Sequence, residues 1–180
     1  MLILEDIHSK PQRRLFRWLG VDWQATPYAW LSIPFYVAIG ILVTLLGRSP
    51  RSTGSRILAG VGYGLLLIIM NVIHTVGHIL SGNRVGAPMK ANLVTATYHV
   101  NLYPDDPPSL PPRIHLGRAL GGPLLNILAG LTALVVNTFI HVGWVSFFGL
   151  ANLVVAIWCL VPLPGLDGRV ILKNLFRLRG

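Results

Sequence analysis

The sequence predicts an all-α, polytopic membrane protein with four transmembrane helices. Of its 180 residues, 53% are hydrophobic and only 12% are charged, whereas roughly 25% of the residues in a soluble domain are charged. The apolar residues also gather in four runs, each near the length of about 20 residues that a transmembrane helix needs. The length indicates one domain, and the single cysteine excludes an internal disulfide framework.

The four apolar runs are the expected spans. They extend from about Tyr28 to Leu46, Ile57 to Leu80, Leu116 to Ile140 and Trp144 to Leu163. A polar, basic segment of about 27 residues precedes the first span, and no small-residue cleavage site follows it, so we expect this span to be retained rather than removed as a signal peptide.

The distribution of Lys and Arg predicts how the spans are oriented. The net charge is +9, from 15 Lys+Arg against 6 Asp+Glu, but these cations lie between apolar runs, so nucleic acid is not an expected partner. Cytoplasmic segments carry an excess of Lys and Arg, and this predicts that both termini are cytoplasmic. On that side lie Lys10, Arg13, Arg14, Arg17, Arg84, Lys90, Arg113, Arg118, Arg169, Lys173, Arg177 and Arg179, and on the other side lie Arg48, Arg51 and Arg56.

The segments outside the spans carry weaker patterns. Pro11 to Trp23 and Gly168 to Gly180 interleave apolar and basic residues, as helices that lie on a membrane surface do. Residues 92 to 103 alternate apolar and polar side chains, which predicts a strand. Asp105 to Pro112 is rich in proline, which favours a stiff, extended connector.

Polar residues inside a membrane span cost free energy and so point to function. The second span contains Asn71, His74 and His78, whose spacing places them on one helix face. Two histidines four residues apart can bind one metal ion. Packed histidines are also commonly hydrogen-bonded to neighbours, so the pair alone leaves both interpretations open.

The acidic residues are few, and one of them closes an apolar run. This residue is Asp167, which follows Pro162, Pro164 and Gly165 at the end of the fourth span. These prolines and the glycine must interrupt the helix, and non-helical backbone near membrane depth is tolerated only beside protein or a polar cavity. A plain helix stop explains the prolines and the glycine but does not explain the acid.

The predicted orientation brings three unusual clusters to one depth. Spans two and four both end on the cytoplasmic side, which puts the two histidines and Asp167 at that level. Span three begins there with Gly121 to Asn126, and its small residues give a face that allows another helix to approach closely. These small residues are Ala119, Gly122, Asn126 and Gly130. We therefore expect a site near the cytoplasmic side.

Three motifs, in this order, resemble the core of the site-2 protease family of intramembrane zinc metalloproteases. They are His74-Thr-Val-Gly-His78, Gly122-Pro-Leu-Leu-Asn126 and Pro162-Leu-Pro-Gly-Leu-Asp-Gly168. The resemblance implies a three-helix core, one zinc ion held by His74, His78 and Asp167 with water in the fourth position, and a β segment that can pair with an unwound substrate. It places Asn71, Gly122, Pro123, Asn126, Pro164 and Gly168 at substrate or core-motif positions.

The resemblance also sets the expected segments. Residues 57–172 form the site-2 protease-like core, after a basic interfacial segment at 1–27 and the first span with its loop at 28–56. Residues 173–180 form a basic tail.

Two motif positions depart from the family. The glutamate that acts as general base, directly after the first histidine, is Thr75 here, and the chain has a single glutamate, Glu5. Loss of a positioned base typically lowers a rate by about 10² to 10⁴-fold. Trp158-Cys159 also stands where Phe-Asn is expected. Asp105, Asp106 and His99 are candidate substitute bases that the spacing does not bring to the site.

The sequence therefore predicts a site-2 protease-like protein that retains zinc, lacks proteolysis, and serves as a pseudoprotease or an accessory or assembly subunit. Its expected partners are the lipid bilayer and other membrane protein subunits. One alternative is an active protease with a substitute base. Another is a pigment- or haem-binding subunit with a single axial histidine, because His74 and His78 share one face and His141 lies about 20 Å away in depth.

Overall fold

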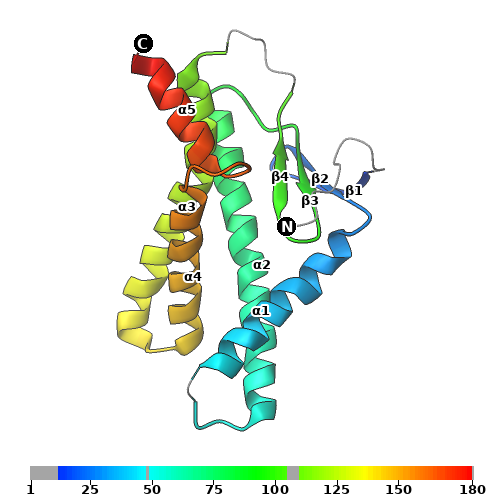
Figure 1. Cartoon of the computed structure of the whole chain (residues 1–180), viewed down its shortest axis with the longest axis vertical. Coiled ribbons are helices and arrows are strands. Elements are labelled where there is room, and N and C mark those ends of the chain that lie inside the picture. The colour runs from blue at the N-terminus through cyan, green and yellow to red at the C-terminus, as the bar shows by residue number, and fades with distance from the viewer. Residues whose placement is uncertain (1–11, 48, 105–109, 180) are drawn as a thin grey trace. The chain divides into compact units, whose positions relative to one another are not determined.

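The computed structural model describes residues 12–47, 49–104 and 110–179 (Figure 1). The chain divides into two compact units. The first unit consists of Met1–Ile69 and Lys90–Leu102, and the second unit consists of Met70–Met89 and Tyr103–Gly180. The elements in chain order are β1 (Arg13–Trp18), β2 (Val21–Ala25), the 3₁₀ turn η1 (Ala29–Leu31), α1 (Ser32–Leu46), α2 (Thr53–Arg84), β3 (Ala91–Val94), β4 (His99–Leu102), α3 (Pro112–Ile140), α4 (Gly143–Cys159) and α5 (Asp167–Arg179).

The chain is an integral membrane protein by the length and composition of its helices. Three stretches are long and apolar enough to cross a membrane: Ala29–Leu46, Thr53–Arg84 and Pro112–Ile140. The fourth predicted span is α4, an apolar helix of 17 residues that ends at Cys159 rather than at Leu163. It ends early because the prolines that follow lack the N–H that a helix interior needs.

The predicted fold is correct in being mostly helical, but the described residues contain a four-stranded sheet, and strands replace the expected N-terminal interfacial helix. Residues 13–25 contribute β1 and β2 instead, which pair antiparallel through a two-residue turn at Leu19 and Gly20, where φ is 52° and 80°. Two positive φ values are the geometry of a tight hairpin. The interleaved aromatic and basic residues that favoured a helix fit two short strands equally well, with Val21 and Trp23 buried on one face.

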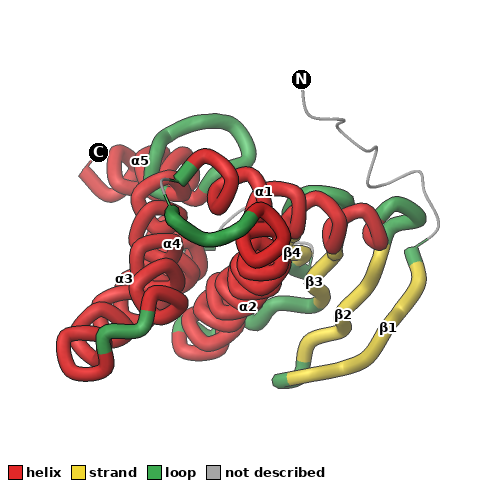
Figure 2. Tube along the Cα trace, turned by 90° about the horizontal axis from the view of Figure 1, so that it is seen from below, coloured by secondary structure: helices red, strands yellow, loops and turns green. Residues whose placement is uncertain are grey.

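The single strand predicted over residues 92–103 is also a hairpin. β3 and β4 pair antiparallel, with Asn92 opposite Asn101. Thr95 stabilises the turn between β3 and β4, because its Oγ1 donates to the Tyr98 carbonyl at 2.7 Å and accepts from the Tyr98 amide at 3.2 Å. β2 and β3 pair in parallel, so the four strands form one mixed sheet in the order β1-β2-β3-β4 (Figure 2).

Glycines allow α1 and α2 to pack backbone against backbone. A side chain at Gly40 would overlap the backbone of Gly60 and Gly64, and one at Gly64 would lie 2.8 Å from the Tyr36 carbonyl oxygen. The Tyr36 hydroxyl donates to the Thr97 carbonyl at 2.9 Å, which ties α1 to the β3–β4 turn.

In the second unit, α3 packs against both α4 and α5. Gly130 of α3 faces Gly149 of α4, so part of the predicted small-residue face of the third span does meet a helix closely. The helix expected after Gly168 is α5. Of the predicted proline-rich connector, residues 105–109 lie outside the described part of the chain.

Gly64→Ala is predicted to lower the free energy of unfolding by about 1 to 3 kcal/mol, since the new methyl group forces α1 and α2 apart. Gly54→Ala, in the same helix, is the matched control because a Cβ there meets nothing within 4 Å. Thermal unfolding of both variants in detergent measures the difference, and equal midpoints would contradict the close packing.

Candidate metal centre

The two histidines of α2 meet at their Nε2 atoms. His74 and His78 are one helical turn apart, which places both on one face. Their Nε2 atoms are 3.0 Å apart, and the rings stand nearly perpendicular, with centroids separated by 4.7 Å. His78 is 2% exposed, so these nitrogens lie in the interior of the unit.

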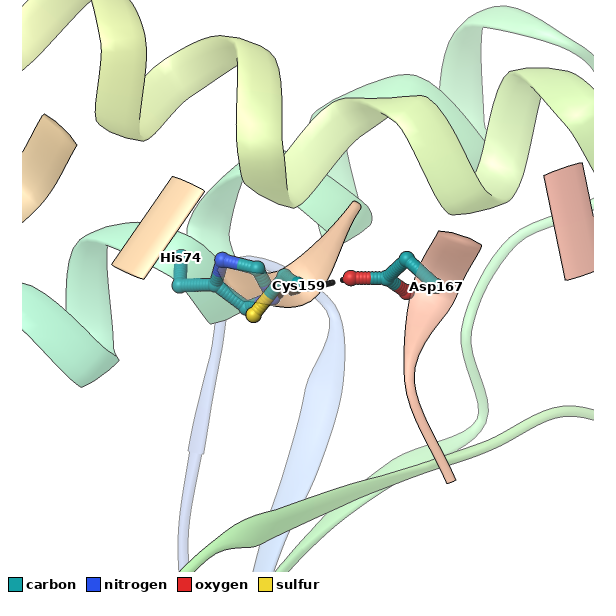
Figure 3. A group of neighbouring side chains, drawn as sticks. All are labelled: His74, Cys159 and Asp167. Atoms are coloured by element: carbon teal, nitrogen blue, oxygen red, sulfur yellow. Dashed lines mark ion pairs between the residues drawn. The ribbon is translucent and has the colours of Figure 1, made fainter. Parts of the chain in front are cut away.

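Asp167 brings a carboxylate to the same point. Its Oδ2 lies 3.2 Å from His74 Nε2, and its Oδ1 lies 3.4 Å from His78 Nε2; Figure 3 marks the ion pair between His74 and Asp167. Asp167 is the first residue of α5, where unpaired amide groups favour a negative charge. The helix therefore stabilises the carboxylate as well as positioning it.

The turn between α4 and α5 fixes where Asp167 stands. Pro162 and Pro164 prevent α4 from continuing, and Gly165 has φ of 84°, which suits glycine. A side chain at Gly168 would overlap the Leu160 carbonyl group, so the two ends of the turn are in backbone contact. Pro164 is exposed and Gly168 is buried, so these two motif positions shape the turn.

α3 supplies the wall of the site through small residues. A Cβ at Gly122 would lie 2.6 Å from His74 Nε2 and even closer to His78 Nε2, so only glycine leaves room for both imidazoles. Pro123 and Asn126 are buried in the same helix. Neither amide atom of the Asn126 side chain has a hydrogen-bond partner among the described residues.

A backbone carbonyl orients His78. Its Nδ1 lies 2.8 Å from the Arg118 carbonyl oxygen, and since a carbonyl only accepts, Nδ1 carries the proton. Arg118 is itself buried: its Nε donates to the Ala87 carbonyl at 2.9 Å, and its guanidinium lies 4.1 Å from the centre of the Tyr103 ring. In the sequence Arg118 is only one of the basic residues between two predicted spans, and no sequence signal reveals this contact.

The donor set fits a zinc ion. With the proton of His78 on Nδ1, its Nε2 lone pair faces Nε2 of His74 and the carboxylate of Asp167, an arrangement that a proton or a bound cation among these groups stabilises. Zinc with ligand bonds near 2.0 to 2.2 Å in a tetrahedron has ligand atoms about 3.3 Å apart. The two Nε2 atoms are 3.0 Å apart, and each lies 3.2 or 3.4 Å from a different carboxylate oxygen of Asp167, which is close to that value.

Thr75 stands at the motif position of the general base but is engaged with its own helix. It is 1% exposed, and its hydroxyl donates to the Asn71 carbonyl at 3.1 Å. Of the candidate substitute bases, His99 lies in β4 with its ring edge-on to Trp23. Asp105, Asp106 and Glu5 lie outside the described residues.

Cys159 is a neighbour of the site that the sequence analysis did not count as a ligand. Its Sγ, a ring nitrogen of His74 and a carboxylate oxygen of Asp167 all lie within 4.8 Å of one another (Figure 3). The available signal was a soft donor eight residues before the predicted acidic ligand, at a position where the family resemblance leads one to expect asparagine.

Comparison with known proteins gives the fold. No protein-family model and no curated protein matches the chain. Among solved structures, the chain is similar to the site-2 protease from Methanocaldococcus jannaschii, with a TM-score of 0.66 and 20% sequence identity. The match covers 92% of this chain and 72% of that one.

Proposed function

We propose that this chain, which has the site-2 protease fold, is a membrane-embedded pseudoprotease that binds one zinc ion and does not hydrolyse peptide bonds. The observation that carries the proposal is the contrast within one helical turn of α2. His74 and His78 meet the carboxylate of Asp167, whereas Thr75 between them offers a hydroxyl already bonded to the helix backbone.

His74, His78 and Asp167 are the residues that would hold the zinc. A zinc ion in such a site supplies Lewis acidity and fixes the surrounding segments. Because α2 provides the histidines and α5 the carboxylate, the metal would also link these helices. Gly122 leaves space for the imidazoles, and the Arg118 carbonyl holds one of them in the orientation for binding.

Peptide hydrolysis requires a group that takes a proton from water and returns it to the leaving amine. A threonine hydroxyl keeps its proton near pH 7, so Thr75 cannot act as that base. Asp167 is the one carboxylate of the described residues that the structure brings to the two histidines, and the proposal assigns it to the metal as a ligand. The alternative of an active protease with a substitute base therefore has no supporting contact in the described part of the chain.

A pigment or haem role is disfavoured by the same geometry. His74 Nε2 and His78 Nε2 face each other at 3.0 Å, with Gly122 against both rings. A macrocycle bound to either nitrogen would have to separate them. His141, at the far end of α3, is about 28 Å along the helix from Gly122 at 1.5 Å per residue.

We propose that both termini are cytoplasmic and that the site lies near that side, within a core of residues 57–172. A protein of this kind acts by binding rather than by cleavage, as an accessory or assembly subunit of a membrane complex. β4 forms one edge of the described sheet, and an extended segment of a partner subunit can add to such an edge.

Purified protein is predicted to contain about one zinc per chain by elemental analysis. His78→Ala or Asp167→Ala should reduce the content at least about tenfold, because each removes one of three ligands. His141→Asn is the matched control, since asparagine tolerates the left-handed backbone at this position, where φ is 51°. Metal absent from the unmutated protein after purification without chelators, and after incubation with zinc, would overturn the proposal.

The zinc-loaded protein in liposomes is predicted to leave a transmembrane substrate uncleaved over hours, because the site lacks a base. An active site-2 protease with the same substrate is the positive control, and gel analysis of cleavage products is the measurement. Turnover that requires zinc and disappears in His74→Ala would show an active protease instead.

The subunit role predicts that the tagged chain, extracted from its native membrane in mild detergent, elutes together with a defined set of membrane proteins. Size-exclusion chromatography with mass spectrometry measures this. A stable, solitary monomer from the native membrane would contradict the subunit role while leaving the metal site untouched.

A further inference from the structure

The last residue of α4 places a thiol beside the proposed metal ligands. Cys159 is half-buried, and its Sγ lies within 4.8 Å of a ligand-type atom of His74 and of Asp167. It is also the chain's single cysteine. Figure 3 shows the three side chains converging from α2, the end of α4 and the start of α5.

The backbone around Cys159 is held in place. The amide of the next residue, Leu160, donates to the carbonyls of Ala156 and Ile157 at 3.2 and 3.1 Å, which closes α4. The Leu160 carbonyl in turn packs against Gly168 of α5. Cys159 and Asp167 therefore stand at the two ends of one closed turn, and both side chains are directed to His74.

We propose that Cys159 is a fourth protein ligand of the zinc, so that His74, His78, Asp167 and Cys159 form a closed tetrahedral site. This inference rests on the proposed zinc site. In a tetrahedron, a thiolate at 2.3 Å and an imidazole nitrogen near 2.05 Å are about 3.6 Å apart. Sγ therefore lies at most about 1.2 Å beyond this separation from a ring nitrogen of His74 and a carboxylate oxygen of Asp167. Binding releases the thiol proton to water.

The charge balance favours four ligands over three. Zinc with two neutral imidazoles and one carboxylate leaves a net charge of +1. A thiolate brings the net charge to zero, and a neutral centre is far less costly to bury among apolar helices than a charged one. Four protein ligands also leave no open position for water, as in structural zinc sites. A thiolate ligand at Cys159 and a threonine at position 75 therefore have the same consequence, because each favours a structural zinc site over a catalytic one.

Cobalt(II) replaces zinc and reports a thiolate directly, through a charge-transfer band in the near ultraviolet. Titration of the metal-stripped, full-length protein in detergent with cobalt is predicted to produce this band, saturating at about one equivalent. Cys159→Ser should abolish the band and weaken cobalt binding by about tenfold or more. His141→Asn should retain it. No other thiol is present in the chain, so the band has a single possible source.

The outcomes of the cobalt titration test the Cys159 ligand separately from the zinc site formed by His74, His78 and Asp167. Cobalt that binds unmutated protein without the band shows that Cys159 is not a ligand, and the three-ligand site then stands alone. Protein that binds no cobalt and no zinc refutes the metal site itself. If Cys159→Ser fails to fold, the unmutated protein still decides the assignment. Its cobalt band is measured before and after alkylation of the thiol, and alkylation should abolish the band if Cys159 is a ligand.

Discussion

Two imidazoles and a carboxylate lie together in a bundle of apolar helices, and a positive charge among them, from a proton or a bound cation, stabilises this grouping. With the proton of His78 held on Nδ1 by the Arg118 carbonyl, its Nε2 lone pair faces Asp167 at 3.4 Å. Uncompensated, that contact would be repulsive, and burial would add to its cost. The proposed zinc ion would satisfy all three donors at once and would join α2 to α5.

Glycines around the site provide the space that this grouping of side chains needs. Gly122 leaves room for both imidazoles, and Gly77 allows α2 to approach α3 at Gly121. Gly168 lets the turn after α4 close against Leu160. Each position is a motif or near-motif glycine whose replacement would move a ligand, so the packing of the helices and the geometry of the site cannot be varied independently.

The sequence predicts the long helices and the convergence of His74, His78 and Asp167, for identifiable reasons. The apolar runs are long, and helical periodicity alone puts His74 and His78 on one face. The N-terminal hairpin is missed because its interleaved aromatic and basic residues fit a surface helix as well as two strands. The antiparallel pairing of β1 with β2 and the positive φ at Leu19 and Gly20 distinguish the hairpin from a helix. Cys159 is missed because its approach to Asp167 depends on a turn whose shape the sequence does not specify.

The central proposal is that a structural zinc site replaces a catalytic one in this protease fold. X-ray absorption at the zinc edge of the purified protein tests this most directly, because it identifies the atoms bound to the metal without assuming any activity. We expect two imidazoles, one further oxygen and one sulfur, with distances of about 2.0 to 2.1 Å for nitrogen and 2.3 Å for sulfur. A zinc ion without imidazole scattering, or protein without zinc, would contradict the central claim.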